Sequence, residues 1–132
     1  MTDIKNIHLS VEIREACLGD VPGLLEMVAE LAEFEHLADQ LVATEEDYRE
    51  SLFGEHPAAE ALVATASEQL VGYAIFFSTF STFVGRAGIW LEDLYVRPDF
   101  RKAGIGKKLL KAVGRIAEKP NAGRYESCVL DW

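Results

Sequence analysis

The sequence has few of the features that mark disulfide, metal and membrane proteins. Only two cysteines occur in 132 residues, Cys17 and Cys128, and they have no metal-ligand spacing. So few cysteines argue against a disulfide framework and favour thiols in a reducing cytoplasm, without a metal. No run of about 18 apolar residues is present, so we expect no membrane-spanning helix.

Other absences narrow the class of protein further. The first six residues lack a basic stretch followed by an apolar core, so we expect no signal peptide. Internal repeats, low-complexity tracts and linkers are absent, and 132 residues suit one domain, which we place at residues 1–132. Basic charge is scarce, because 13 lysines and arginines stand against 22 aspartates and glutamates, a net charge of −9. This charge argues against nucleic acid as the main partner.

The charges are unevenly distributed along the chain. Residues 1–60 contain 15 acidic and 3 basic residues, whereas residues 61–132 contain 7 acidic and 10 basic residues. Seven of these basic residues lie between Arg97 and Arg115, with Asp99 as the one acid among them. An acidic first half and a basic patch would suit a cationic substrate and an anionic cofactor. Alternatively, the acids only keep the surface soluble, which accounts for most of them individually.

Hydrophobic periodicity predicts an α/β protein with a mixed, mostly antiparallel sheet flanked by helices. Strands are expected at residues 8–14, 61–65, 70–79, 89–96 and 124–130. Helices are expected from residue 21 to about 34–36, from about 45 to 53, and from 104 to about 118, with a loop at residues 81–88. Asp20 is expected to cap the first helix, and Thr44 the second.

The stretch at residues 90–107 combines a strand, a turn and a glycine-rich helix start. The strand stops at Pro98, because proline has no N–H to give to a neighbouring strand. A helix start leaves about four backbone N–H groups without partners, and with the helix dipole they attract anions. Gly104 and Gly106 have no Cβ, so a phosphate could approach the backbone closely. A simple glycine-containing helix cap is the alternative, but the flanking strand, helix and cations together favour pyrophosphate binding.

These residues resemble the acetyl-CoA signature of the GNAT N-acetyltransferases, R/Q-x-x-G-x-G/A after a strand with an acidic pair. Here the letters RKAGIG at residues 101–106 follow LEDLYV at residues 91–96. The letters LAEFE at residues 31–35 and FGEHP at residues 53–57 are similar to the diamine (spermidine/spermine-type) acetyltransferase branch. The resemblance runs from about residue 13 to 132. It implies a C-terminally shortened GNAT fold and a homodimer.

The resemblance also implies an acetyl-CoA-dependent N-acetyltransferase that acts on a primary amine of a small cation, such as a diamine, polyamine or lysine analogue. Glu92 would bind the substrate and remove its proton indirectly, and Glu35 would hold the distal ammonium. Further substrate-binding residues implied in this way are Asp93, Glu126, Ser127 and Cys128. Neighbouring side chains on a regular strand point to opposite faces, so Glu92 and Asp93 could not both line one pocket. A β-bulge would remove this constraint, and the GNAT fold has a bulge in the matching strand. Asp93 therefore has two open interpretations, a substrate-facing group or a structural acceptor.

The same resemblance assigns the cofactor contacts. Backbone groups in the strand would pair with the pantetheine arm of acetyl-CoA, at Leu94, Tyr95 and Val96. The pyrophosphate would be held at the glycine motif by Arg101, Lys102, Ala103, Gly104, Ile105, Gly106 and Lys107. Most of these contacts are backbone amides, which tolerate changes of the side chain.

The sequence departs from this family after Trp132, where the branch continues with an Asn-x-x-x-x-x-Phe-Tyr helix and a last strand pair. The tyrosine that usually gives a proton to the thiolate is absent. A fragment, a shortened gene product and a degenerate relative are all consistent with this. We favour a truncated ordinary enzyme, and we expect this chain to be less active than an extended one. Two other functions stay open, namely a GNAT enzyme for another amine acceptor and a non-catalytic CoA-binding module.

Overall fold

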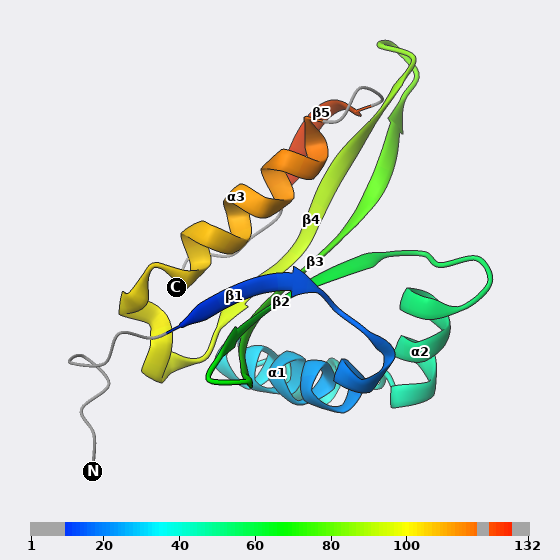
Figure 1. Ribbon diagram of the computed structural model, residues 1–132. Helices are drawn as coiled ribbons and strands as arrows, with labels where there is room; N and C mark the ends of the chain where they lie inside the picture. Colours follow the sequence, from blue (N-terminus) through cyan, green and yellow to red (C-terminus); the bar gives the residue numbers. More distant parts are fainter. Residues whose placement is uncertain (1–9, 119–121, 128–132) are drawn as a thin grey trace.

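The computed structural model describes residues 10–118 and 122–127, which form a five-stranded sheet covered by helices (Figure 1). The strands follow the order β1 (Val11–Glu15), β2 (Glu60–Ala66), β3 (Gln69–Ser81), β4 (Arg86–Val96) and β5 (Ala122–Ser127). The helices are α1 (Val21–Phe34), α2 (Glu45–Phe53) and α3 (Ile105–Ala117). Strands β1 to β4 pair antiparallel, and β5 pairs parallel to β4. The predicted α/β architecture and the predicted order of elements are confirmed.

The sheet has one helical layer on each face (Figure 1). On one face, α1 packs on a cluster that includes Leu24, Met27, Leu31, Val63, Tyr73 and Tyr95. On the other face, α3 packs on a cluster that includes Leu62, Leu91, Val96, Ile105, Leu109 and Val113. The apolar stripe of α3 repeats at helical spacing and the strands alternate between the two faces, so each face has its own core.

Strands β3 and β4 form a long hairpin in place of the loop predicted at residues 81–88. Their pairing continues as far as Ser81 and Arg86, which leaves only residues 82–85 in the turn. This prediction was wrong because the end of the hairpin lies away from both cores. Phe80 is 67% exposed and Phe83 is 100% exposed, and neither core cluster includes a residue between 77 and 88, so no alternation of apolar side chains marks these strand ends in the sequence.

Asp20 is the N-cap residue of α1, as predicted, but its side chain makes no capping hydrogen bond to the helix. Its carboxylate accepts two hydrogen bonds from the Arg14 guanidinium, at 2.7 and 3.1 Å, and one from the Cys17 N–H at 2.8 Å. Because Asp20 already has helical φ and ψ, its side chain points back to β1 rather than forward to the helix. Thr44 does cap α2 as predicted, since its hydroxyl accepts the Asp47 N–H at 3.1 Å.

The first and last strands are shifted from their predicted limits. Strand β1 ends one residue later than predicted, and residues 8 and 9 of the predicted strand lie outside the described residues. Strand β5 begins two residues earlier than predicted, and residues 128–130 lie outside the described residues. These shifts leave the order of elements unchanged.

Candidate functional site

The chain passes from β4 to α3 through a tight turn that exposes the start of the helix. A 3₁₀ turn spans Pro98–Ala103, and Gly104 then joins it to α3 with φ 76° and ψ 14°. This left-handed conformation favours glycine. The Lys108 N–H donates to the Gly104 carbonyl at 3.2 Å, so helical pairing starts there and the preceding amides point out of the helix end. Exposed amides at a helix start are groups that can bind an anion, so the pyrophosphate site predicted here stays a prediction.

The two glycines of this turn serve different purposes. A Cβ on Gly104 would meet no atom within 4 Å, so its φ, rather than crowding, requires glycine. A Cβ on Gly106 would lie 3.8 Å from Cγ2 of Val96, which is an ordinary contact. The sequence identified both as points of close approach for a phosphate. It did not reveal the backbone requirement at Gly104, because φ cannot be read from one glycine.

Arg101 connects the turn to its surroundings. Its Nε donates to the Val96 carbonyl at 2.8 Å. The guanidinium carbon lies 5.4 Å from the centroid of the Phe34 ring and 5.5 Å from that of Tyr95, which is cation–π range. The side chain predicted at the cofactor motif therefore also ties β4 and the end of α1 to the glycine turn.

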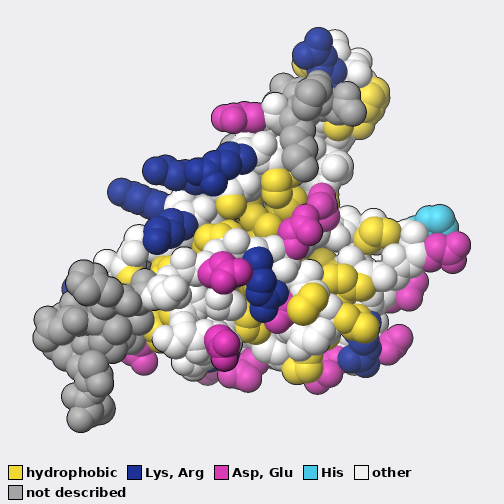
Figure 2. All heavy atoms as spheres, in the orientation of Figure 1, with side chains coloured by type: hydrophobic (Ala, Val, Ile, Leu, Met, Phe, Trp, Pro, Cys, Tyr) yellow, Lys and Arg dark blue, Asp and Glu magenta, His cyan; other side chains and the backbone are white. Residues whose placement is uncertain are grey.

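Basic side chains surround the start of α3 and continue along its outer face. The exposed members are Lys102, Lys107, Lys108, Lys111 and Arg115. Figure 2 shows lysine and arginine side chains projecting on the α3 side, whereas most acidic side chains lie over the α1 and α2 side. The charge separation along the sequence is therefore also a separation in space.

Strand β4 contains a β-bulge at Glu92. Leu91 and Asp93 pair with consecutive residues of β3, so Glu92 is the extra residue. Leu91 belongs to the core under α3, whereas Tyr95 belongs to the core under α1. The bulge thus exchanges the two faces and turns Asp93 toward α1. The bulge that the family resemblance implied is present.

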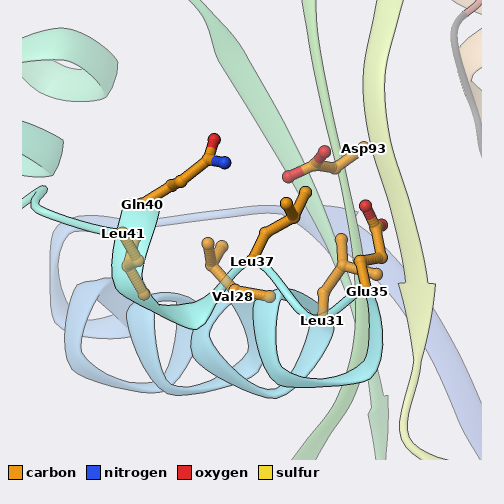
Figure 3. A pocket seen from close by; sticks show the side chains of 8 residues that line it. Val28, Leu31, Glu35, Leu37, Gln40, Leu41 and Asp93 are labelled. Carbon is orange, nitrogen blue, oxygen red and sulfur yellow. The ribbon is translucent and has the colours of Figure 1, made fainter.

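A pocket of about 200 Å³ opens between β4, the end of α1 and the 3₁₀ turn Ala38–Gln40 (Figure 3). Its polar groups are Glu35, Asp93 and Gln40. Its apolar walls are formed by Val28, Leu31, Ala32, Leu37 and Leu41. Figure 3 shows the Asp93 carboxylate directed across the pocket from β4, and the Glu35 side chain rising beside β4 from the end of α1, so both line the pocket. Two carboxylates above apolar walls suit a cation carried on an apolar stem.

Asp93 is partly buried and lies among other acidic and phenolic groups. Burial is the main factor that raises its pKa, and the charges of Glu92 and Glu35 raise it further. The Tyr73 hydroxyl donates to Oδ2 of Asp93 at 3.0 Å, which lowers the pKa again. Burial and the Asp93 charge together raise the pKa of Tyr48, on α2, to about 12. Asp93 is therefore the pocket carboxylate whose ionisation depends on its neighbours.

Glu92 occupies a more open position than Asp93. Its carboxylate is exposed and accepts a hydrogen bond from Nε1 of Trp90 at 3.3 Å. It does not line the pocket that contains Glu35 and Asp93. The sequence left two interpretations of Asp93 open. In the structure it accepts the Tyr73 bond and also lines the pocket, and its contact with a substrate stays a prediction. Sequence reasoning missed Tyr73, Tyr48 and Gln40, since nothing in their local sequence connects them to Asp93.

Other acids of α1 have structural partners. Glu30 accepts the Tyr95 hydroxyl at 2.8 Å. Arg97 lies 3.0 Å from the Glu26 carboxylate and 3.5 Å from that of Glu30. These contacts fasten the end of β4 to α1, so part of the acidic surface holds the site together rather than facing a ligand.

Strand β5 reaches only part of β4. Glu126 lies opposite Trp90 and Ser127 opposite Leu91, which brings the backbone of both predicted residues near the bulge. Within the described part of the chain, β5 does not pair with β4 beyond Leu91. Cys128, the remaining predicted substrate residue, lies outside the described residues.

Neither a membrane-spanning helix nor a metal-binding cluster occurs in the described ranges, 10–118 and 122–127. No helix there is long and apolar enough to cross a membrane. No group of three or more His, Cys, Asp or Glu residues there could hold a metal ion.

A matching family model, two related sequences and a solved structure similar to this chain are all named for acetyltransferases. The model of the Acetyltransferase (GNAT) family matches residues 25–131. A thialysine N-epsilon-acetyltransferase of Sus scrofa is 43% identical over 131 residues, which cover 93% of this chain and 76% of that protein. Spermidine/spermine N(1)-acetyltransferase-like protein 1 of Homo sapiens is 30% identical over 128 residues, which cover 92% of this chain and 18% of that protein. A ribosomal-protein-alanine N-acetyltransferase from Brucella melitensis has a TM-score of 0.74 and 26% identity, over 92% of this chain and 81% of its own.

Proposed function

The chain belongs to the GNAT acetyltransferase family, and we propose that it transfers an acetyl group from acetyl-CoA to a primary amine of a small cation, such as a diamine, polyamine or lysine analogue. The observation that carries this proposal is the pocket between α1 and β4, which Glu35 and Asp93 both line. Amines of this kind have pKa values near 10, so a diamine is doubly charged at neutral pH. The carboxylates attract one ammonium while apolar walls cover its stem. The lysine-analogue and spermidine-type names of the relatives support this class.

Acetyl-CoA would lie along the edge of β4 and end at the start of α3. The backbone of Leu94, Tyr95 and Val96 would pair with the pantetheine arm, on the edge beyond the last described β5 pair. The pyrophosphate would lie at the amides of residues 102–107, with Arg101 holding the turn in place. The exposed lysines around this helix start attract the phosphates.

On this arrangement, Glu92 would lie between the acceptor amine and acetyl-CoA. Acyl transfer requires that the ammonium lose a proton and that the thioester oxygen be stabilised as it gains charge. The carboxylate of Glu92 is exposed on the bulge, and it would take the proton through water. Glu126, Ser127 and Cys128 would complete the substrate side next to the bulge, as the family resemblance implies.

We further propose that residues 1–132 form a single domain of a cytoplasmic homodimer that needs no metal. One continuous sheet through all five strands supports the single domain. The low cysteine content supports a reducing compartment. The homodimer rests on the family resemblance, and sedimentation of the purified protein would test it.

The test of the acceptor class is the substitution Glu35→Gln. Acetylation is measured with a diamine and with a monoamine of the same stem length. Glu35→Gln should raise the KM for the diamine about tenfold, which is the size of one lost charged contact, and leave the monoamine unchanged. Glu33→Gln, an exposed acid two residues away on α1, is the matched control. Equal use of both amines by the unsubstituted protein would overturn the assignment of a dicationic acceptor.

A further inference from the structure

Tyr73 lies next to the pocket that Glu35 and Asp93 line, which is called the acceptor pocket below. Its side chain is completely buried, with 0% of its surface exposed. It is on β3, opposite Tyr95 of β4, and the centroids of the two rings are 6.0 Å apart. Its hydroxyl is the donor of the 3.0 Å bond to Oδ2 of Asp93. A buried phenol whose hydroxyl contacts a pocket carboxylate is placed to control that carboxylate.

The bulge at Glu92 makes this contact possible. Without the extra residue, Asp93 would share the face of Leu91 and point toward α3. With it, Asp93 shares the face of Tyr73 and Tyr95, next to α1. The bond occupies one carboxylate oxygen, and Figure 3 shows the carboxylate directed into the pocket.

We propose that Tyr73 is a positioning residue of the acceptor site, whose buried hydroxyl holds the Asp93 carboxylate toward the pocket and so sets the preference for acceptors with a second cation. This inference rests on the function proposed above. Tyr73 itself touches no substrate and acts through Asp93.

The groups around Asp93 explain why the hydrogen bond from Tyr73 affects the charge of this carboxyl group. Asp93 faces Glu35 from α1, Glu92 from its own strand and the Tyr48 hydroxyl from α2. Burial and the two neighbouring carboxylates favour the protonated form of Asp93, and the bond from Tyr73 favours the charged form. Burial also raises the pKa of Tyr73, so its hydroxyl keeps the proton that it donates. Without this donor, Asp93 becomes neutral at a higher pH and no longer attracts an ammonium.

The substitution Tyr73→Phe tests the proposal, because it removes the hydroxyl and keeps the ring. The measured quantity is the ratio of kcat/KM for a diamine to kcat/KM for a monoamine of the same stem, followed against pH. Both substrates must lose a proton from the attacking amine, so the pH dependence caused by that step largely cancels in the ratio. In the unsubstituted protein the ratio should fall on the acid side, as Asp93 takes up a proton. In Tyr73→Phe the fall should move to higher pH, and between the two midpoints the ratio should be about tenfold lower than in the unsubstituted protein.

Two further variants separate positioning from a general packing effect. Tyr48→Phe removes another hydroxyl near Asp93 and should leave the pH midpoint of the ratio unchanged. In an Asp93→Asn background, Tyr73→Phe should have no further effect on the ratio, since both changes act on one group. If Tyr73→Phe lowers the folded fraction, the single substitution Asp93→Asn still tests whether the ionisation of Asp93 controls the ratio. Asp93→Asn should abolish the fall of the ratio at acid pH.

The possible outcomes distinguish this inference from the function on which it rests. A diamine preference in the unsubstituted protein, retained in Tyr73→Phe with the same pH midpoint, would overturn the role of Tyr73 alone. No diamine preference in the unsubstituted protein would overturn the proposed acceptor class instead. A stability loss in Tyr73→Phe without any change in the ratio would show that the tyrosine is only structural.

Discussion

Glu92 and Asp93 are neighbours in sequence, but the bulge gives them different surroundings. Asp93 is partly buried against Tyr73, whereas Glu92 is exposed beside Trp90. A partly buried carboxylate, held in its charged form by the Tyr73 hydroxyl, suits a group that binds a cation. The exposed Glu92 suits the movement of a proton to water.

The substitution Glu92→Gln should separate chemistry from cofactor binding. Acetyl-CoA affinity should stay unchanged, because Glu92 lies away from the glycine turn. The acetylation rate should fall about 100-fold or more, which is the usual contribution of a general base. Calorimetry and steady-state rates measure the two quantities, and Glu12→Gln on the edge strand β1 is the control. A normal rate in Glu92→Gln would remove this residue from the mechanism.

Asp20 provides a residue-scale prediction about stability. Its hydrogen bonds to Arg14, offset in part by burial, lower its pKa from 3.8 to about 2. A lowered pKa means that the stabilisation is complete above the ordinary carboxyl pKa and is lost as the pH falls through about 2. Asp20→Asn should therefore reduce the free energy of unfolding by about 2 kcal/mol at pH 7.

Urea unfolding of both proteins against pH would measure this effect. The difference between them should shrink steadily below pH 4 and approach zero near pH 2. A difference that does not depend on pH would contradict the assignment of Asp20 as an ion-paired carboxylate.

At the scale of elements, the start of α3 is the part of the cofactor site that mutation can test most cleanly. Gly104 is a poor target, because any side chain there strains the positive φ whether or not a phosphate binds. Gly106 lies inside α3, where the backbone accepts a side chain and the nearest atom is 3.8 Å from a new Cβ. Gly106 therefore separates phosphate approach from backbone strain.

Gly106→Val should weaken CoA binding by at least about tenfold, because its methyl groups would stand where the phosphate approaches the amides. Gly114→Val places the same side chain later in the same helix, where no atom lies within 4 Å of a new Cβ. This control should keep the CoA affinity measured by calorimetry. Equal affinities in both folded variants would rule out the helix start as the pyrophosphate site.

Elements with a strong period could be predicted from sequence, and irregular ones could not. The stripe Ile105, Leu109 and Val113 repeats at helical spacing over the sheet, so α3 was predicted within a residue at each end. The outer part of the β3–β4 hairpin lies away from both core clusters, so its sequence has no apolar alternation. The ion pair of Asp20 depends on Arg14 of another element, and a capping pattern alone cannot show that partner. The bulge came from the family resemblance rather than from the letters around Glu92.

At the scale of the whole molecule, the sheet separates two regions of opposite charge. The pocket with Glu35 and Asp93 lies on the α1 face, and the basic side chains lie along α3 on the other (Figure 2). Strand β4 takes part in both, because its bulge turns Asp93 to one face and its end leads into the glycine turn. The sequence alone predicts that the first half of the chain is acidic and that the stretch around α3 is basic. The meeting of Glu35, Gln40 and Asp93 in one pocket depends on how distant elements pack, and sequence alone could not give it.

The most direct test is acetyl-CoA consumption by this protein with putrescine, spermidine, a lysine analogue and a monoamine of matched stem. CoA binding is measured by calorimetry in the same preparation. The account predicts CoA binding and turnover, with the dicationic acceptors used at least about tenfold better than the monoamine. CoA binding without turnover on any amine, or equal turnover on all of them, would contradict it.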